Sequence, residues 1–580
     1  MARPFASGDD SIGQKPVRIA LWHSETSAEV LGLPPRAFDA WVHDWEQFFS
    51  RERFSCRRLT GPALDAATLT EYNVLVLPTA VALSDDEIEA VKRFVRRGNG
   101  VVMVWAAGTR TETGNWRSSS LLQQIGGLDL AGPIPESERE GFSSVALSAR
   151  TPLTLGLPPG LALAVARYDE PLTAHLREPR TETAGAWIIA ARQTPQSRLS
   201  TEEQRRRAVI AYGDYLGGRF VWFGFPLGAA GLPEQQRMAD QLTRQAIAWV
   251  AQQAIAYKNP WSENMAGALA LSWSLARADD FDERLPQLAG QYRLPLTTFV
   301  APSLLEEAPD LVRRLAAMGT VALWAGEAGG PMDPPSQEVL IRWREQIERA
   351  TGGQPVGVRL SPRTASDAWL EALVRSGYAF LSSPEYRHLL PQVIRTHRAM
   401  PIFARERELW LIPELTPADL EDAKRGSAQG EDSFERAMEA VAMDEGLLHL
   451  SLAPGQVDSM MLNRLDALFS HAKRSHIWAT DVASILEFYR VWGHLRVSTD
   501  YPTPNRTAIQ ISNTGARHSG DLSVFIRMSQ RMESPDIRPT TLGSPPVHPF
   551  TQDGLTWRFD LARIPPGKNY LYHLYRTESP

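Results

Sequence analysis

The chain has 580 residues, of which 43% are hydrophobic and 22% are charged, and its net charge is -6. At about 150 residues per domain, this length predicts three or four domains rather than one core. The composition excludes disordered and fibrous proteins, and the absence of a basic stretch argues against nucleic-acid partners. No apolar run of membrane-spanning length occurs, so no membrane span is expected. The polar start, residues 1–16, is expected to be a flexible tail without a signal peptide, which makes the cytoplasm the default compartment unless the true start lies upstream.

The first part of the chain, residues 17–255, shows the pattern of an α/β domain. Short apolar runs at 17–22, 73–77 and 100–105 are typical of parallel strands buried on both faces. Ser84 and the acidic residues after it predict the start of a helix between the second and third runs. A glycine pair further along predicts a β-hairpin, and a long amphipathic helix follows it. The only cysteine, Cys56, lies in a predicted strand, and we expect it to be a buried structural thiol.

This part resembles the class I glutamine-amidotransferase-like fold, a flavodoxin-like α/β sandwich, in the branch that accompanies carbohydrate enzymes. The resemblance rests on YNVLVLPTAVALSDDEIEAVKRFVRRGNGVVMVW and AYGDYLGGRFVWFGFP. True amidotransferases carry a nucleophilic cysteine on a strained turn after the fourth strand. Here that strand runs into Trp105 and small residues, so glutaminase activity is not predicted. A ligand-binding platform and a homo-oligomer interface remain as roles for this domain.

Residues 256–493 alternate strand patterns, such as 296–300, with helix patterns, such as 306–318 and 337–351. This alternation predicts a closed or nearly closed parallel barrel. The block from AGALALSWSLARADDFDERLPQLAG through GQPVGVRLSPRTASDAWLEALVRSGYAFLSS resembles the polysaccharide deacetylase family, of the chitooligosaccharide-deacetylase type. The resemblance implies a distorted (β/α) barrel that removes N-acetyl groups from amino sugars with a divalent metal. It also implies three metal ligands, one aspartate after the first strand and two histidines in a His-x-x-x-His turn, together with a neighbouring aspartate that serves as base and an arginine that orients the base.

The chain departs from this family at the residues that carry the chemistry. The base position corresponds to Ser274 and one ligand position to Leu275, while the two histidines of the His-x-x-x-His turn correspond to Ala325 and Gly329. Because a catalytic metal needs about three protein ligands, we expect no metal and no other cofactor. Glu327 lies alone in that turn and cannot hold a metal by itself.

Several residues remain as candidates. Arg359 corresponds to the orienting arginine, for which a groove role and a surface ion pair are equally favoured, and His449 corresponds loosely to a general acid but fits a core histidine better. Asp279 and Asp280 are predicted to cap a helix rather than replace the lost ligands. Three tryptophans near predicted strand ends could stack on sugars, although core packing is favoured for them: Trp273, Trp324 and Trp410.

Residues 494–580 alternate polar and apolar residues between turn signals, which predicts a β-sandwich. The whole pattern therefore favours a multidomain α/β protein that recognises a polysaccharide or supports assembly without catalysis. The alternative is an active deacetylase or related hydrolase of N-acetylated glycans. Its nonstandard site would draw on Asp279, Asp280, Glu327 and His449, with a divalent metal only in this case.

Overall fold

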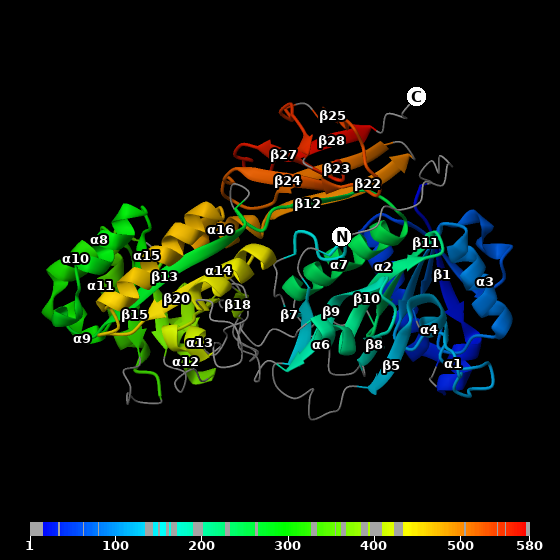
Figure 1. Ribbon diagram of the computed structural model, residues 1–580, viewed down its shortest axis with the longest axis horizontal. Coiled ribbons are helices and arrows are strands. Elements are labelled where there is room, and N and C mark those ends of the chain that lie inside the picture. Colours follow the sequence, from blue (N-terminus) through cyan, green and yellow to red (C-terminus); the bar gives the residue numbers. More distant parts are fainter. Residues whose placement is uncertain are drawn as a thin grey trace.

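The computed structural model describes most of the chain. The described residues are 16–32, 35–61, 63–78, 80–133, 143–148, 151–157, 162–163, 171–189, 201–226, 233–261, 265–325, 333–353, 355–360, 367–383, 392–394, 409–422, 433–503, 506–541, 543–551 and 553–575. Figure 1 shows three bodies: an N-terminal α/β body, a second one with parallel strands and many helices, and a C-terminal β body that lies across both. The predicted flexible tail falls almost wholly outside the described residues.

The N-terminal body is built on an 11-stranded sheet whose path begins β2-β1-β3-β4-β11-β10. The five strands from β2 to β11 are parallel to one another, and β10 and β11 form the predicted hairpin. Leu216 and Gly217 occupy its turn with φ of 48° and 100°, as a type I′ turn requires. The strands of this sheet are β1 (Arg18–Ser24), β2 (Ser55–Gly61), β3 (Val74–Leu77), β4 (Gly100–Val104), β5 (Leu128–Pro133), β6 (Ser143–Leu147), β7 (Ala162–Leu163), β8 (Leu172–Leu176), β9 (Thr181–Ile189), β10 (Ala208–Tyr215) and β11 (Gly218–Phe223).

Helices cover both faces of this sheet, as continuous apolar strands require. On one face α2 (Pro35–Arg51) and α7 (Pro233–Val250) pack against alternate strand residues, and on the other face α3 (Asp85–Arg96) and α4 (Leu121–Gly126) do so. Ser84 and Glu87 form a capping box at the start of α3, which confirms the predicted helix start. No described helix is both long and apolar enough to cross a membrane.

The second body contains a curved sheet with seven parallel strands in the order β20-β13-β14-β15-β16-β17-β19, and β18 is antiparallel at its edge. Just beyond β19, Leu415 forms a parallel bridge to Leu450 of β20, so the two ends of the sheet meet. This contact supports the predicted nearly closed barrel. The strands are β13 (Gly267–Leu275), β14 (Leu296–Val300), β15 (Gly319–Ala325), β16 (Gly357–Leu360), β17 (Phe380–Ser383), β18 (Gln392–Ile394), β19 (Leu409–Pro413), β20 (Leu447–Leu452) and β21 (Ile477–Thr480), which extends the pairing of β13.

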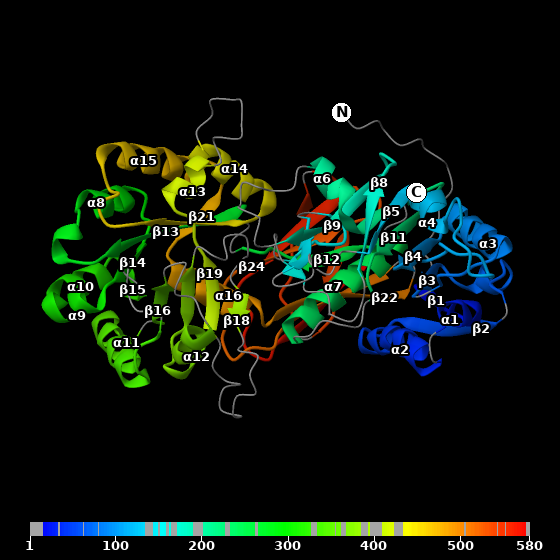
Figure 2. The same ribbon diagram turned by 90° about the horizontal axis from the view of Figure 1, so that it is seen from below.

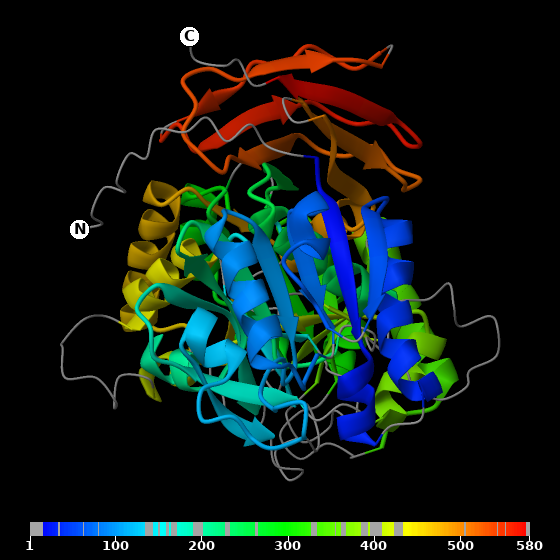
Figure 3. The ribbon, with the colours of Figure 1, turned by 90° about the vertical axis from the view of Figure 1, so that its right-hand side faces the viewer.

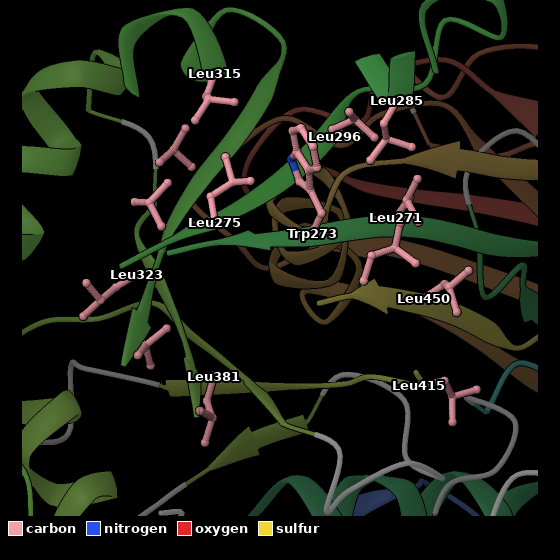
Figure 4. Packing of buried hydrophobic residues seen from close by; sticks show 14 of the residues in the cluster. Leu271, Trp273, Leu275, Leu285, Leu296, Leu315, Leu323, Leu381, Leu415 and Leu450 are labelled. Carbon is pink, nitrogen blue, oxygen red and sulfur yellow. The ribbon is translucent and has the colours of Figure 1, made fainter. Parts of the chain in front are cut away.

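Two different layers cover the faces of this barrel sheet. Leu271, Trp273 and Leu275 of β13 point to the outer helices, where leucines surround them (Figure 4). The intervening residues point inward, where α16 (Val482–Trp492) packs on the small side chains of Ala268 and Ala270. Figure 2 shows the outer helices around the strands. They are α8 (Arg284–Gln291), α9 (Pro302–Glu307), α10 (Pro309–Ala316), α11 (Gln337–Thr351), α12 (Asp367–Arg375), α13 (Pro417–Asp422), α14 (Ser433–Asp444) and α15 (Ser459–Arg474).

The C-terminal body consists of two four-stranded sheets that enclose an apolar core, as Figure 3 shows at the top of the view. One of these strands is not C-terminal. β12 (Ile255–Lys258), the segment between the first two bodies, pairs antiparallel with β24 along its whole length. The predicted boundary at 255/256 therefore falls inside a strand of the sandwich. The other strands are β22 (Leu495–Thr503), β23 (Arg506–Asn513), β24 (Leu522–Arg527), β25 (Asp536–Pro539), β26 (Phe550–Thr551), β27 (Thr556–Leu561) and β28 (Asn569–Tyr575).

The thiol of Cys56 packs against the core under α2, and its burial raises its pKa to about 12. Alkylation requires the thiolate. At pH 9 we therefore expect native Cys56 to react with iodoacetamide roughly 500-fold more slowly than in denaturant, where its pKa returns to that of a free thiol. Mass spectrometry of the modified chain measures both rates. Equal rates in native and denatured protein would show that Cys56 is reactive.

Candidate functional site

A cluster of polar side chains lies on the inner face of the barrel, with members from three of its strands and from the segment after β19. Register places Trp324 beside Arg359 and Arg359 beside Ser382, so these three side chains share one face. Ser274 lies on the same face of β13, because it alternates with the outward Trp273 and Leu275. Glu414 follows β19 directly. We call Ser274, Arg359, Ser382 and Glu414 the Arg359 cluster.

Arg359 is the centre of this cluster. Its Nε donates to Oε1 of Glu414 at 2.9 Å, and its Nη1 donates to Oγ of Ser274. The second oxygen of Glu414, Oε2, accepts from the Ser382 hydroxyl at 2.5 Å. The Glu414 side chain is 0% exposed and that of Arg359 is 11% exposed, so the ion pair is almost dry. Arg359 therefore pairs with a buried carboxylate, and the predicted surface ion pair is wrong.

The chemistry of the Arg359 cluster follows from this geometry. A charge-assisted pair in a dry site is strong only while both partners remain in place. Both carboxylate oxygens of Glu414 accept hydrogen bonds, and the guanidinium cancels its charge. The Glu414 carboxylate is thus held as an acceptor for Arg359 and Ser382. A general base, by contrast, needs a lone pair that is directed at the substrate. At the position that the resemblance assigns to the base, the structure has the hydroxyl of Ser274, which accepts from the same arginine.

His449 also lies on the inner face, on β20, and it is 1% exposed. Its Nε2 and the hydroxyl of Ser272 on the neighbouring strand β13 are 2.8 Å apart. The backbone carbonyl of His449 accepts from the Leu415 amide in the bridge that joins the sheet ends. A buried histidine that bonds a core serine agrees with the favoured prediction of a core residue.

The two aspartates after β13 do not point to a catalytic arrangement. Oδ2 of Asp280 accepts the backbone N–H groups of Ala276 and Arg277 at 2.8 and 2.9 Å, and Asp279 is exposed. They belong to a short 3-10 turn, Ala278–Asp280, whereas α8 begins only at Arg284. The prediction that they cap the next helix is therefore wrong, because Asp280 closes its own turn. Glu327 lies outside the described residues.

The three tryptophan candidates differ in where they point. Trp273 is 2% exposed on the outer face, where its indole donates to Thr298 Oγ1 at 2.8 Å. Trp410 is 9% exposed and lies deep on the inner face, with its ring 6.4 Å from that of Tyr489. Both are core residues, in agreement with the favoured prediction, so neither ring is exposed for stacking on a sugar. Trp324 is only half-buried and neighbours Arg359 in register, so it alone of the three can present a ring beside the Arg359 cluster. In the C-terminal β body, the aromatic side chains of Trp557, Tyr570 and Tyr572 are likewise buried.

The described residues do not fit the divalent metal that a deacetylase resemblance implies. No group of three histidine, cysteine, aspartate or glutamate side chains gathers among the described residues in a way that could hold an ion. Leu275 points outward into the helix-facing core, and Glu414 is fully engaged by its two donors. A hard cation needs several free oxygen or nitrogen donors, and this face supplies hydroxyls around a neutralised ion pair.

Sequence reasoning missed two members of the cluster, Glu414 and Ser382. A signal for Glu414 was present, because it is a lone charge directly after the apolar run LWLIP, at the carboxyl end of a barrel strand. Ser382 carries no such signal, since a serine near a strand end is common in cores.

No protein-family model matches the chain, and no curated protein matches it. Solved structures that match part of it include polysaccharide deacetylases and an allantoinase. The allantoinase has 15% identity and a TM-score of 0.32 over 40% of this chain and 93% of its own. A probable polysaccharide deacetylase from Pseudomonas aeruginosa PAO1 has 16% identity and a TM-score of 0.31 over 40% of this chain and 94% of its own. A β-galactosidase from Bacillus circulans sp. alkalophilus has 12% identity and a TM-score of 0.27, and the match spans only 31% of that enzyme. The fold description therefore rests on the strand order and register given above.

Proposed function

We propose that this protein binds a polysaccharide through a deacetylase-like barrel that performs no deacetylation, with no resident divalent metal. The observation that carries the proposal is the buried Arg359–Glu414 pair together with Ser274 at the base position. Deacetylation needs a base and an activated water. The Arg359 guanidinium, paired with the buried Glu414 carboxylate, supplies neither a base nor an activated water. It instead keeps the inner face rigid and polar.

The proposed binding surface is the half-buried ring of Trp324 beside this polar cluster. An indole face packs on the apolar face of a sugar ring, and nearby hydroxyls and amides select its orientation. Because the charges of Arg359 and Glu414 cancel, the surface suits an uncharged saccharide. The amidotransferase-like first domain is part of the same proposal, as a non-catalytic platform joined to the barrel.

Replacement of Trp324 with alanine tests the binding surface. We expect the affinity for a bound oligosaccharide to fall about tenfold, the loss of one aromatic contact. Isothermal titration with chitopentaose, cellopentaose and mannopentaose measures it. Trp116→Ala is the matched control, because Trp116 is 67% exposed and lies in the first domain. Wild-type affinity in the Trp324→Ala protein, with its fold intact by circular dichroism, would contradict the proposal.

Catalysis is tested separately by acetate release from N-acetylated oligosaccharides, with Zn²⁺ added, and by metal analysis of the purified protein. We expect no turnover above the uncatalysed rate and less than one equivalent of metal. Stoichiometric metal with turnover that is lost in Asp279→Ala or His449→Ala would instead establish the alternative, a hydrolase with a nonstandard site.

A further inference from the structure

A row of aromatic rings lies at the carboxyl edge of the first sheet, far from the barrel. The ring centroids of Trp41 and Trp105 are 6.4 Å apart and tilted by 57°, and Phe38 lies 6.3 Å from Trp41. Phe38 is buried, whereas both tryptophans are half-buried. Trp41 comes from α2, which follows β1, and Trp105 follows β4 directly. We call Trp41 and Trp105 the indole pair.

The backbone at Trp105 is held in an unfavourable conformation. Its φ is 54°, in the left-handed region, which is costly for a bulky side chain and is normally occupied by glycine. The Trp105 amide donates to Phe223 at 2.6 Å, and its carbonyl accepts from the Trp222 indole at 2.8 Å. These bonds fix the strained residue. Observed strain of this kind, at a ring that is not fully buried, points to a role beyond packing.

The position of the indole pair is also informative. In open α/β sheets, ligands bind beyond the carboxyl ends of strands near the point where strand order reverses, which here lies between β1 and β3. The space directly after β1 is taken by the protein itself, because the Ser27 hydroxyl bonds the backbone of Ala82 at 3.0 and 3.1 Å. The indole pair flanks this point. In Figure 1, α1 (Glu25–Leu31) marks this edge of the sheet, on the side away from the sandwich.

Polar groups adjoin the aromatic row at its other end. The ring of His23 is 5.2 Å from that of Phe38, and its Nε2 lies 3.2 Å from Asp39, which also pairs with Arg58. Nδ1 of His23 is buried and has no hydrogen-bond partner among the described residues. Burial lowers the pKa of His23, so at neutral pH the imidazole has one acceptor nitrogen. With Nε2 donating to Asp39, that acceptor is Nδ1.

From these observations we infer that the indole pair binds a pyranose ring of a neutral oligosaccharide, in a site separate from the barrel. The two indole planes are inclined at 57° to each other, so their half-buried faces can contact apolar C–H groups on more than one side of a puckered ring. A planar base would need parallel faces, and a quaternary ammonium ion would need a free carboxylate or a fuller aromatic cage. Asp39 does not supply that carboxylate, because Arg58 and His23 engage it.

The test is titration of the full-length protein with chitopentaose, cellopentaose and mannopentaose, in variants that remove one ring at a time. We expect Trp41→Ala and Trp105→Ala each to weaken one class of sites about tenfold. Trp116→Ala is the matched control, since this ring is more exposed, follows the same strand and already stacks on Arg110 at 4.5 Å. It is expected to bind as the wild type does. Trp324→Ala removes the barrel site alone, so each site can fail independently of the other.

Trp105→Gly guards against a folding artefact, because glycine adopts the positive φ without strain. It is expected to keep the wild-type circular dichroism spectrum and to lose binding at the indole pair. The inference is overturned if no oligosaccharide binds at a second site in the wild type, if the folded Trp41 and Trp105 variants bind as the wild type does, or if choline competes for the site.

Discussion

Replacement of Glu414 with alanine is expected to lower the free energy of unfolding by about 3–5 kcal/mol, the cost of leaving a buried guanidinium without its partner. Arg359 would remain 11% exposed with only the Ser274 hydroxyl to accept from it. Ser382 would lose its acceptor as well. Urea unfolding followed by circular dichroism and by calorimetry measures the change.

Two further variants distinguish the loss of the ion pair from a nonspecific loss of stability. The double variant Arg359→Met with Glu414→Leu removes both charges at similar volume, so it should be much more stable than Glu414→Ala. Asp279→Ala removes an exposed carboxylate and should stay within about 0.5 kcal/mol of the wild type. If Glu414→Ala matched Asp279→Ala, the Arg359–Glu414 pair would not hold the barrel together, and the main support for the proposed function would be lost.

The sequence predicted most strands because parallel strands that are buried on both faces leave continuous apolar runs. Residues 296–300 and helix 337–351 agree with the structure at both ends. Interruptions within helices were harder to predict from the sequence. The helix predicted over 306–318 is divided into α9 and α10 where Pro309 begins a new helix after Ala308.

Only part of the candidate site could be predicted from the sequence, because the site depends on which strands are neighbours in the sheet and in what register. Arg359 was singled out by resemblance, but its partner lies 55 residues further on and meets it only through the register of β16, β17 and β19. The alternation of side chains along a strand explains which way Trp273 and Trp324 point. Trp273 follows and precedes inward serines, so it must point outward, and Trp324 shares the face of Arg359. Alternation in a parallel strand is hidden when both faces are buried, so the apolar run alone did not reveal it.

The contribution of β12 to the sandwich could not be predicted, because a four-residue run, IAYK, gives no indication of its partner. Residues of β12 and of the segments beside it join the three bodies through hydrogen bonds. Nζ of Lys258 donates to the carbonyls of Trp492 and Leu495 at 2.5 and 2.6 Å, and its burial lowers its pKa. Tyr501 of β22 donates to Ala254 at 2.7 Å, and Arg244 of α7 donates to Thr499. The sandwich thus contacts both of the other bodies.

Removal of β12 is therefore expected to lower the stability of the sandwich more than any single substitution does. A chain of residues 254–580 keeps β12 on β24, whereas a chain of residues 260–580 leaves the edge of β24 without a partner and uncovers the core against which Ala256 packs. An unpaired apolar edge promotes aggregation. We expect the chain of residues 254–580 to be soluble and monodisperse by size-exclusion chromatography, with a folded circular dichroism spectrum. We expect the chain of residues 260–580 to aggregate. A chain ending at 493 should aggregate for the same reason, because it leaves β12 unpaired. If residues 260–580 stayed monodisperse with the same thermal midpoint as residues 254–580, β12 would be a linker that merely rests on the sandwich.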